Sequence, residues 1–287
     1  MFSHSSKSPA SIKSDSEHRF GRWLRGLQMG VLLLSLVGVS AVCVSAGGGV
    51  EFIEDITPVT EEITIVIEAA RADVELYPGE AGTVITQIEA GNQPKVVHRV
   101  RPGGILPTSR LLIETFIPIE YAPRSRAIVR MWIPDGAEIK VTGEDVSVSI
   151  RGPIAGTIEV SGQITLTEGD ATLTDVVGDF EIKTDLGGIT LNRVDGEVDA
   201  ETGRGSIFFR GAPSPSEISH LETGAGSIFA DLSRTPEIPV SARAERGAIL
   251  IHDGENPLSG SRISIVPDDG VASLELVTGN GIIDIRR

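Results

Sequence analysis

Residues Glu201-Thr-Gly-Arg-Gly-Ser-Ile-Phe-Phe209 return almost letter for letter as Glu222-Thr-Gly-Ala-Gly-Ser-Ile-Phe-Ala230. Weaker copies of this stretch occur at 183–191, 245–251 and 277–285, and two tighter ones occur at 142–148 and 167–173. A ragged repeat of about 20 residues is typical of architectures in which short units stack on one another.

The copies align on the last turn residue before each apolar run, which is Gly in six of the seven units and Glu144 in the first. The second and fourth positions after it are apolar in every unit. These pairs are Val146/Val148, Ala171/Leu173, Ile189/Leu191, Ile207/Phe209, Ile228/Ala230, Ile249/Ile251 and Ile283/Ile285. Such alternation predicts short strands with one buried face, and the glycines provide tight corners where φ is positive.

This pattern favours a parallel β-solenoid, because one such strand can bury its apolar face only against its neighbours. We expect Ile207, Ile228 and Ile249 to stack inward on successive rungs. The intervening residues Phe208, Phe229 and Leu250 should then form an outward apolar ladder, unless the insertion at 212–216 covers it. An antiparallel β-sandwich is the alternative, since it also has short strands with frequent turns.

Residues 63–135 contain six longer runs without the repeat: 63–68, 73–77, 83–89, 95–101, 110–117 and 127–133. We interpret them as an N-terminal β-cap, because an open solenoid end would expose unpaired strand edges. The long gap between the last two units should hold one extra coil built on Ile263/Ile265 and Leu274/Leu276. The predicted organisation is a disordered cytoplasmic tail (1–28), a transmembrane helix (29–46), a linker (47–62), the β-cap (63–135) and the solenoid repeats (136–287).

The run Met29–Ala46 has no charged residue over 18 positions and follows Arg19, Arg22 and Arg25. It predicts a single-pass membrane anchor with the N-terminus inside and everything after Gly47 extracytoplasmic. A cleaved signal peptide ending at Ala46 is the alternative.

The charge is unevenly placed along the chain. Residues 1–28 hold five Lys/Arg and two acids, so the remaining twenty Lys/Arg and thirty-eight acids give the rest a net charge of −18. So acidic a body argues against nucleic acid as a partner. Because Cys43 is the only cysteine, no internal disulfide can form.

The motifs that usually carry chemistry are absent from the sequence. There is no Gly-x-Ser-x-Gly, Walker or EF-hand pattern, and His98, His220 and His252 stand alone and are interpreted as surface residues. We therefore expect no catalytic residue, no metal site, no cofactor and no enzymatic activity. A carbohydrate-active β-helix enzyme is the alternative, and it would need clustered carboxylates on one face.

One basic constellation stands out between residues 92 and 130, against the acidic background. Its candidate contact residues are Arg99, Arg101, Arg110, Arg124 and Arg126. They either neutralise acidic strands of the same chain or form a docking surface for an anionic envelope polymer or a protein partner.

The segment Val129–Ile139, with Ile133-Pro-Asp-Gly136 at its centre, and the Thr-Gly-x-Gly-x-Ile units resemble the bacterial putative-adhesin β-solenoid domains. The resemblance covers roughly 63–287. This chain departs from the family in the irregular spacing of its repeats and in the interruption at 212–215. It implies a parallel β-solenoid displayed at the cell envelope, in a family sometimes linked to envelope-stress sensing, and it transfers no catalytic residue. The predicted function is a membrane-anchored module that acts by surface contact.

Overall fold

The computed structural model describes residues 50–59, 62–91, 97–102, 110–117, 126–235, 237–252, 258–265 and 273–287. All regular secondary-structure elements in these ranges are β-strands, so the described chain is all-β. None of these ranges contains a helix that could cross a membrane. The predicted tail and membrane anchor lie outside them.

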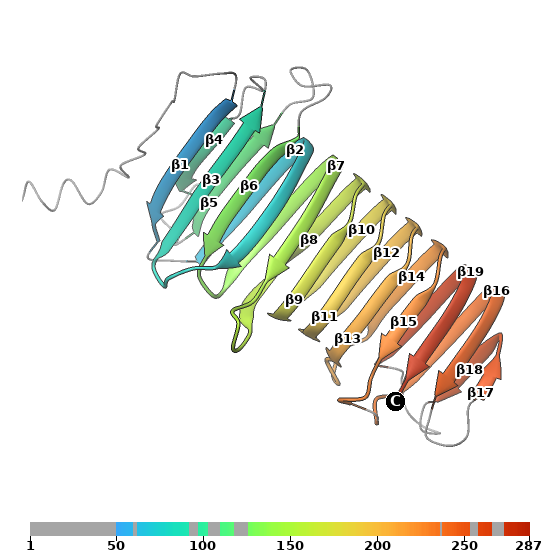
Figure 1. Ribbon diagram of the computed structural model, residues 1–287. Coiled ribbons are helices and arrows are strands. Elements are labelled where there is room, and N and C mark those ends of the chain that lie inside the picture. Colours follow the sequence, from blue (N-terminus) through green and yellow to red (C-terminus); the bar gives the residue numbers. More distant parts are fainter. Residues whose placement is uncertain are drawn as a thin grey trace, which may run out of the picture. The chain divides into compact units, whose positions relative to one another are not determined.

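Six strands make up the N-terminal part (Figure 1). They are β1 (Val50–Pro58), β2 (Glu62–Pro78), β3 (Thr83–Gly91), β4 (Val97–Pro102), β5 (Arg110–Ile117) and β6 (Ala127–Ile133). β2 merges the first two predicted runs into one strand of 17 residues. β1 lies within the predicted linker. The sequence did not indicate this strand, because the polar Asp55 is on its buried face while the apolar Ile56 is 54% exposed.

The repeat region alternates between two facing walls of parallel strands (Figure 1). The first wall holds β8 (Ile158–Glu168), β10 (Phe180–Leu186), β12 (Val198–Arg204) and β14 (Ser219–Ala225). The second wall holds β9 (Ala171–Val177), β11 (Ile189–Gly196), β13 (Ile207–Pro213) and β15 (Ile228–Asp231). Each repeat therefore contributes one strand to each wall.

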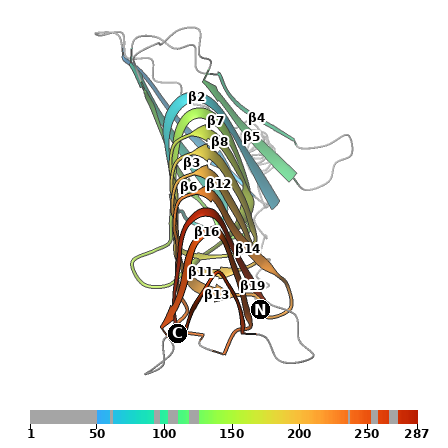
Figure 2. The ribbon, with the colours of Figure 1, turned by 90° about the vertical axis from the view of Figure 1, so that its right-hand side faces the viewer.

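At each end of the repeat strands, one long strand pairs with both walls. β7 (Ala137–Arg151) pairs with β8 through its first half and with β9 through its second. β19 (Leu274–Arg286) does the same with β14 and β15 at the other end. Figure 2 shows β2, β7 and β16 arching from one wall to the other.

The hydrogen-bonded ladder of parallel strands is therefore a closed ring of ten, in the order β7-β8-β10-β12-β14-β19-β15-β13-β11-β9 and back to β7. The prediction of a parallel β-solenoid is wrong: the ring is a closed, flattened barrel. The repeat predicts strands and corners correctly, but it carries no information on how the strands at the two ends of the stack connect the walls.

The core fills the space between the walls. All fourteen residues of the seven apolar pairs are at most 2% exposed. The first unit is displaced by two residues, because Val148 rather than Val146 pairs with Ala171. Val146 itself lies at the corner, where its carbonyl oxygen would be 1.9 Å from a Cβ placed on Gly169.

Glycines stack at that corner because each rung leaves no room for a side chain. A Cβ on Gly187 would lie 1.9 Å from the carbonyl oxygen of Gly169, and one on Gly205 would lie 1.8 Å from that of Gly187. Gly226 repeats this contact with Gly205 at 1.8 Å. Close backbone approach thus explains these glycines, whereas a positive φ occurs only at some of them, such as Gly169 and Gly187.

The threonine of the motif stabilises the same corner. The buried Thr202 hydroxyl donates to the Gly187 carbonyl at 2.9 Å, and the Thr223 hydroxyl donates to Gly205 at 2.8 Å. Thr184 and Thr278 make the equivalent bonds at 3.3 and 3.0 Å. A backbone carbonyl of the tight turn therefore has a side-chain donor in each of these rungs.

The rungs do not follow chain order at the C-terminal end. β19 pairs with β15 on one side and with β16 (Val240–His252) on the other. Ile228 consequently stacks between Ile207 and Ile283, and Ile249 lies one rung further on. All three predicted isoleucines point inward, but the predicted direct contact of Ile228 with Ile249 is wrong.

Two short antiparallel strands pair with β16, namely β17 (Leu258–Gly260) and β18 (Arg262–Ile265). Ile263 and Ile265 pack against the edge of the core. The predicted extra coil is thus divided: Leu274 and Leu276 lie in β19, and the other pair lies in an antiparallel strand.

Candidate functional site

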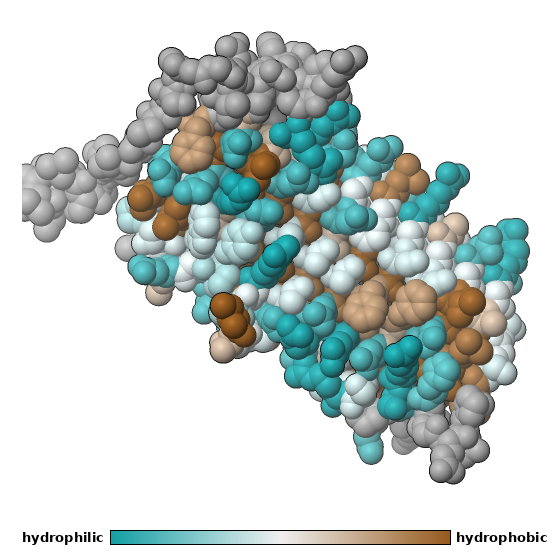
Figure 3. All heavy atoms as spheres, viewed as in Figure 1, coloured by the Kyte–Doolittle hydropathy of each residue, from teal (hydrophilic) through white to brown (hydrophobic). Residues whose placement is uncertain are grey.

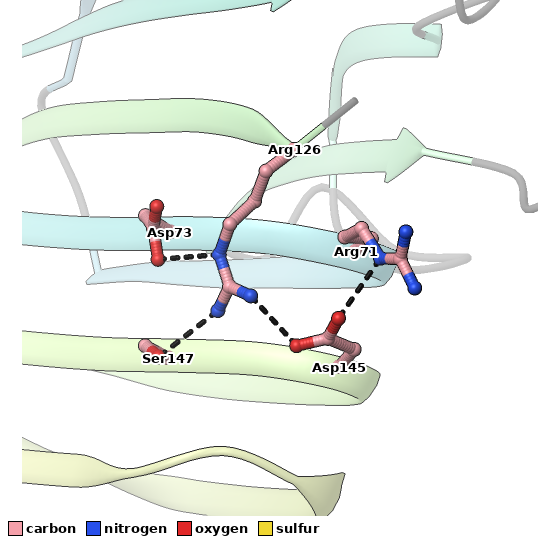
Figure 4. Close-up of polar contacts among 5 residues, drawn as sticks. All are labelled: Arg71, Asp73, Arg126, Asp145 and Ser147. Carbon is pink, nitrogen blue, oxygen red and sulfur yellow. Dashed lines mark hydrogen bonds and ion pairs between the residues drawn. The ribbon is translucent and has the colours of Figure 1, made fainter. Parts of the chain in front are cut away.

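Arg126, one of the predicted contact residues, is engaged within the protein (Figure 4). Its Nε donates to Asp73 at 2.7 Å, its Nη1 donates to Asp145 at 2.6 Å and its Nη2 donates to Ser147 at 3.0 Å. Burial opposes the charge, yet the bonds to Asp73 and Asp145 raise the pKa of Arg126. Asp145 also binds Arg71 Nε at 2.8 Å. This network joins β2, β6 and β7 and leaves the Arg126 guanidinium little capacity for a ligand.

The other predicted basic residues are not part of this network. Arg99 is exposed on β4, opposite Glu114 of β5. Arg101 lies on the same strand, Arg110 begins β5, and Arg124 lies outside the described residues. Since Arg130 also bonds to Glu75 at 2.9 Å, the described contacts of this constellation are with the chain's own acids.

The side chain of His98 is largely enclosed, contrary to its interpretation as a surface residue. Its side chain is 8% exposed, and its Nε2 lies 3.2 Å from Oδ2 of the buried Asp55. Its Nδ1 lies 3.0 Å from the hydroxyl of the buried Thr115, and the Thr57 hydroxyl donates to Asp55 at 2.9 Å. The sequence gives no sign of this cluster, because its members come from three strands. Its burial favours a structural role.

An acidic groove of about 530 Å³ runs over β7, β8, β10 and β12 on the first wall. Its lining includes one cation, Lys140, and five acids: Glu138, Asp179, Glu181, Glu197 and Asp199. Burial, together with the nearby carboxylates of Glu217 and Asp179, raises the pKa of Glu197. Glu181 and Asp199 occupy outward positions of β10 and β12, whereas Asp179 and Glu197 come directly before these strands and Glu138 lies in β7. The sequence did not predict this groove, since the predicted outward ladder lies on the second wall.

The predicted apolar ladder is present in part on the second wall. Phe208 and Phe229 are directly paired and are 40% and 41% exposed, so the 212–216 insertion leaves both rings open. On the next strand, the residue beside Phe229 is Asp284 and not the predicted Leu250. Leu250 lies one strand further on, beside Asp284. Figure 3 shows light-brown side chains on this face, close to hydrophilic ones.

A smaller hollow of about 160 Å³ lies at the end of the aromatic pair. It is lined by Phe208, Phe229, Ala230, Asp231, Asp284 and Arg286. Oδ1 of Asp284 is buried and accepts no hydrogen bond within the described chain, although His252 Nε2 lies 3.3 Å away. Sequence reasoning missed Asp284 as a neighbour of Phe229, because the two are adjacent only through the displaced rung β19.

This arrangement offers an apolar platform beside carboxylates and a guanidinium. It can therefore bind a group that has both an apolar face and hydrogen-bonding atoms. Within the described ranges, no cluster of three or more His, Cys, Asp or Glu could hold a metal ion.

No family model and no curated protein matches the sequence. Among solved structures, similarity is found to a putative cell adhesion protein of Clostridium sporogenes (15% identity, TM-score 0.29, covering 82% of this chain and 99% of that one). It is also found to a putative adhesin of Bacteroides fragilis (10%, 0.34, 82% and 96%) and to a putative lipid binding protein of Parabacteroides distasonis (12%, 0.29, 83% and 97%). These structural neighbours include adhesin-like proteins of bacterial origin, and at such identities and TM-scores they establish no activity for this chain.

Proposed function

We propose that this chain is a non-enzymatic contact module of the cell envelope, and that the second wall is its contact face. The observation that carries the proposal is the exposed pair Phe208 and Phe229. The core of each rung is already closed by Ile207/Phe209 and Ile228/Ala230, so the two outward rings add little to the buried core. Paired exposed aromatics beside a hollow are typical of partner sites.

The module is anchored and displayed outward in this proposal. The support is the charge-free run Met29–Ala46 and the basic residues before it. Protease added to whole cells should then digest residues 50–287 and spare the tail, whereas a mature chain beginning at Gly47 would show that the run is a cleaved signal.

The contact face is tested with Phe208→Ser combined with Phe229→Ser. Binding of the full-length chain to isolated bacterial envelopes should fall while the melting temperature stays unchanged. Ile154→Ser is the matched control, because Ile154 is fully exposed in the loop after β7 and does not line the hollow. Undiminished envelope binding by the double variant would contradict the proposal, and a lowered melt alone would assign the rings to the core.

A carbohydrate-active enzyme is the second candidate, and the acidic groove favours it. Burial and the neighbouring carboxylates raise the pKa of Glu197, which is the direction that the general acid of glycosidic bond cleavage requires. Glu197→Gln should then abolish release of reducing sugar from envelope polysaccharide. If the unaltered chain releases none, the enzyme is excluded for that substrate.

A further inference from the structure

We infer that the ligand of the second wall is a neutral glycan, with one sugar ring seated on Phe208 and Phe229 and its hydroxyls bound by Asp284 and Arg286. This inference rests on the contact face proposed above and names its ligand class.

The aromatic pair forms a platform wider than one ring. Phe208 and Phe229 are direct partners on neighbouring parallel strands, so their Cα atoms are about 4.8 Å apart. The face of an aromatic ring is electronegative, and the C–H bonds on one face of a pyranose are weakly electropositive. A sugar ring lying across the pair would cover both phenyl groups and exclude water from them.

The polar groups stand where the edge of such a ring would lie. Asp284 continues the row of Phe229, while Asp231 and Arg286 belong to the neighbouring outward row of the same wall. Carboxylates accept from hydroxyl groups and guanidinium groups donate to them, so this set matches a rim of hydroxyls. The volume of about 160 Å³ suits one small ring.

Asp284 contributes a carboxylate to the lining of the hollow. Its Oδ1 is buried and lies 3.3 Å from His252 Nε2, which holds the carboxylate from the side of β16. A ligand hydroxyl would donate to this carboxylate from within the hollow.

The charge of the hollow favours a neutral ligand. Its lining holds Asp231, Asp284 and Arg286, and Arg210 lies 3.5 Å from Asp231, so acids and cations nearly balance. The surrounding body of net charge −18 repels an anionic polymer, and the two arginines disfavour a cationic one.

The test is binding of the full-length chain, in mild detergent, to an array of neutral hexose and N-acetylhexosamine oligosaccharides. We expect at least one glycan to bind, about tenfold or more weaker binding for Phe208→Ser with Phe229→Ser, and a similar loss for Asp284→Asn. Asn keeps the size of Asp284 but removes the charge and one acceptor. Ile154→Ser should bind as the unaltered chain does, and all variants should melt normally.

Two outcomes would overturn the inference. If no neutral glycan binds, while envelope binding still depends on the phenylalanines, the contact face stands and its ligand is of another class, such as a protein or a second copy of this chain. If a glycan binds equally well to the double variant, sugar recognition lies elsewhere on the chain. If the double variant unfolds, Asp284→Asn provides the test. Unchanged glycan binding by Asp284→Asn would then overturn the assignment of the site.

Discussion

Asp175 and Arg193 form a two-pronged ion pair between neighbouring rungs of the second wall, and both residues have left-handed backbones, with φ of 59° and 57°. Arg193 Nη2 donates to Asp175 Oδ2 at 2.6 Å, and its Nε donates to Oδ1. Arg193 lies at a register shift of β11 against β13, and Asp175 is its counterpart 18 positions earlier in β9. Two strained residues thus stabilise each other through their side chains.

Asp175→Asn should lower the melting temperature modestly at about pH 7, because Asn tolerates the left-handed backbone but loses the charge. The hydrogen bonds from Arg193 are the main cause of the lowered pKa of Asp175. A lowered folded-state pKa gives stability that is present above the unfolded value of about 3.9 and is lost as the pH falls through the folded value. Thermal melts of both proteins over this acid range should therefore converge at the lowest pH, and a constant difference would contradict the ion-pair explanation.

Gly205→Ala should destabilise the fold severely, since its Cβ would meet the Gly187 carbonyl oxygen at 1.8 Å. We expect the free energy of unfolding to fall by about 3 kcal/mol or more in urea titration. Gly188→Ala, in the preceding repeat, is the matched control, because its nearest neighbours would be 3.5 Å away. Equal effects of the two substitutions would show that chain entropy, and not close approach, explains the glycines.

Ile228→Asp should unfold the repeat region. Ile228 is fully buried between Ile207 and Ile283, and an unpaired carboxylate there costs several kcal/mol against a total stability of about 5–15 kcal/mol. Ile283→Asp should have a similar effect, because Ile283 is equally buried beside Ile228. Loss of the circular-dichroism transition in both variants checks that the two side chains face the core, and a stable Ile283→Asp variant would argue against it.

Asp55→Ala and His98→Ala should each destabilise the N-terminal strands by about 1–3 kcal/mol, because each leaves a buried hydrogen-bonding partner unpaired. The double variant should cost less than the sum of the two, which a double-mutant cycle measures. His252→Ala serves as control, since His252 is half exposed beside Asp284, and its effect should stay within about 0.5 kcal/mol. Strict additivity of Asp55 and His98 would contradict a direct interaction.

The sequence alone determined which face of each repeat strand is buried. Val148, Leu173, Ile207 and Ile285 are all inward as the alternation predicts, because side chains alternate across any strand whatever its neighbours are. The corner glycines and threonines are equally local, since each belongs to a motif that the chain repeats.

Only the tertiary structure decided which strands are neighbours. Phe229 and Asp284 are 55 positions apart, and nothing in either repeat unit specifies that β19 precedes β16 in the wall. The closure of the ladder by β7 and β19, and the burial of His98 against Asp55, depend on the same long-range pairing. Strand alternation is a property of a few consecutive residues, whereas strand order is settled by which distant edges bury the most surface and satisfy each other's backbone hydrogen bonds.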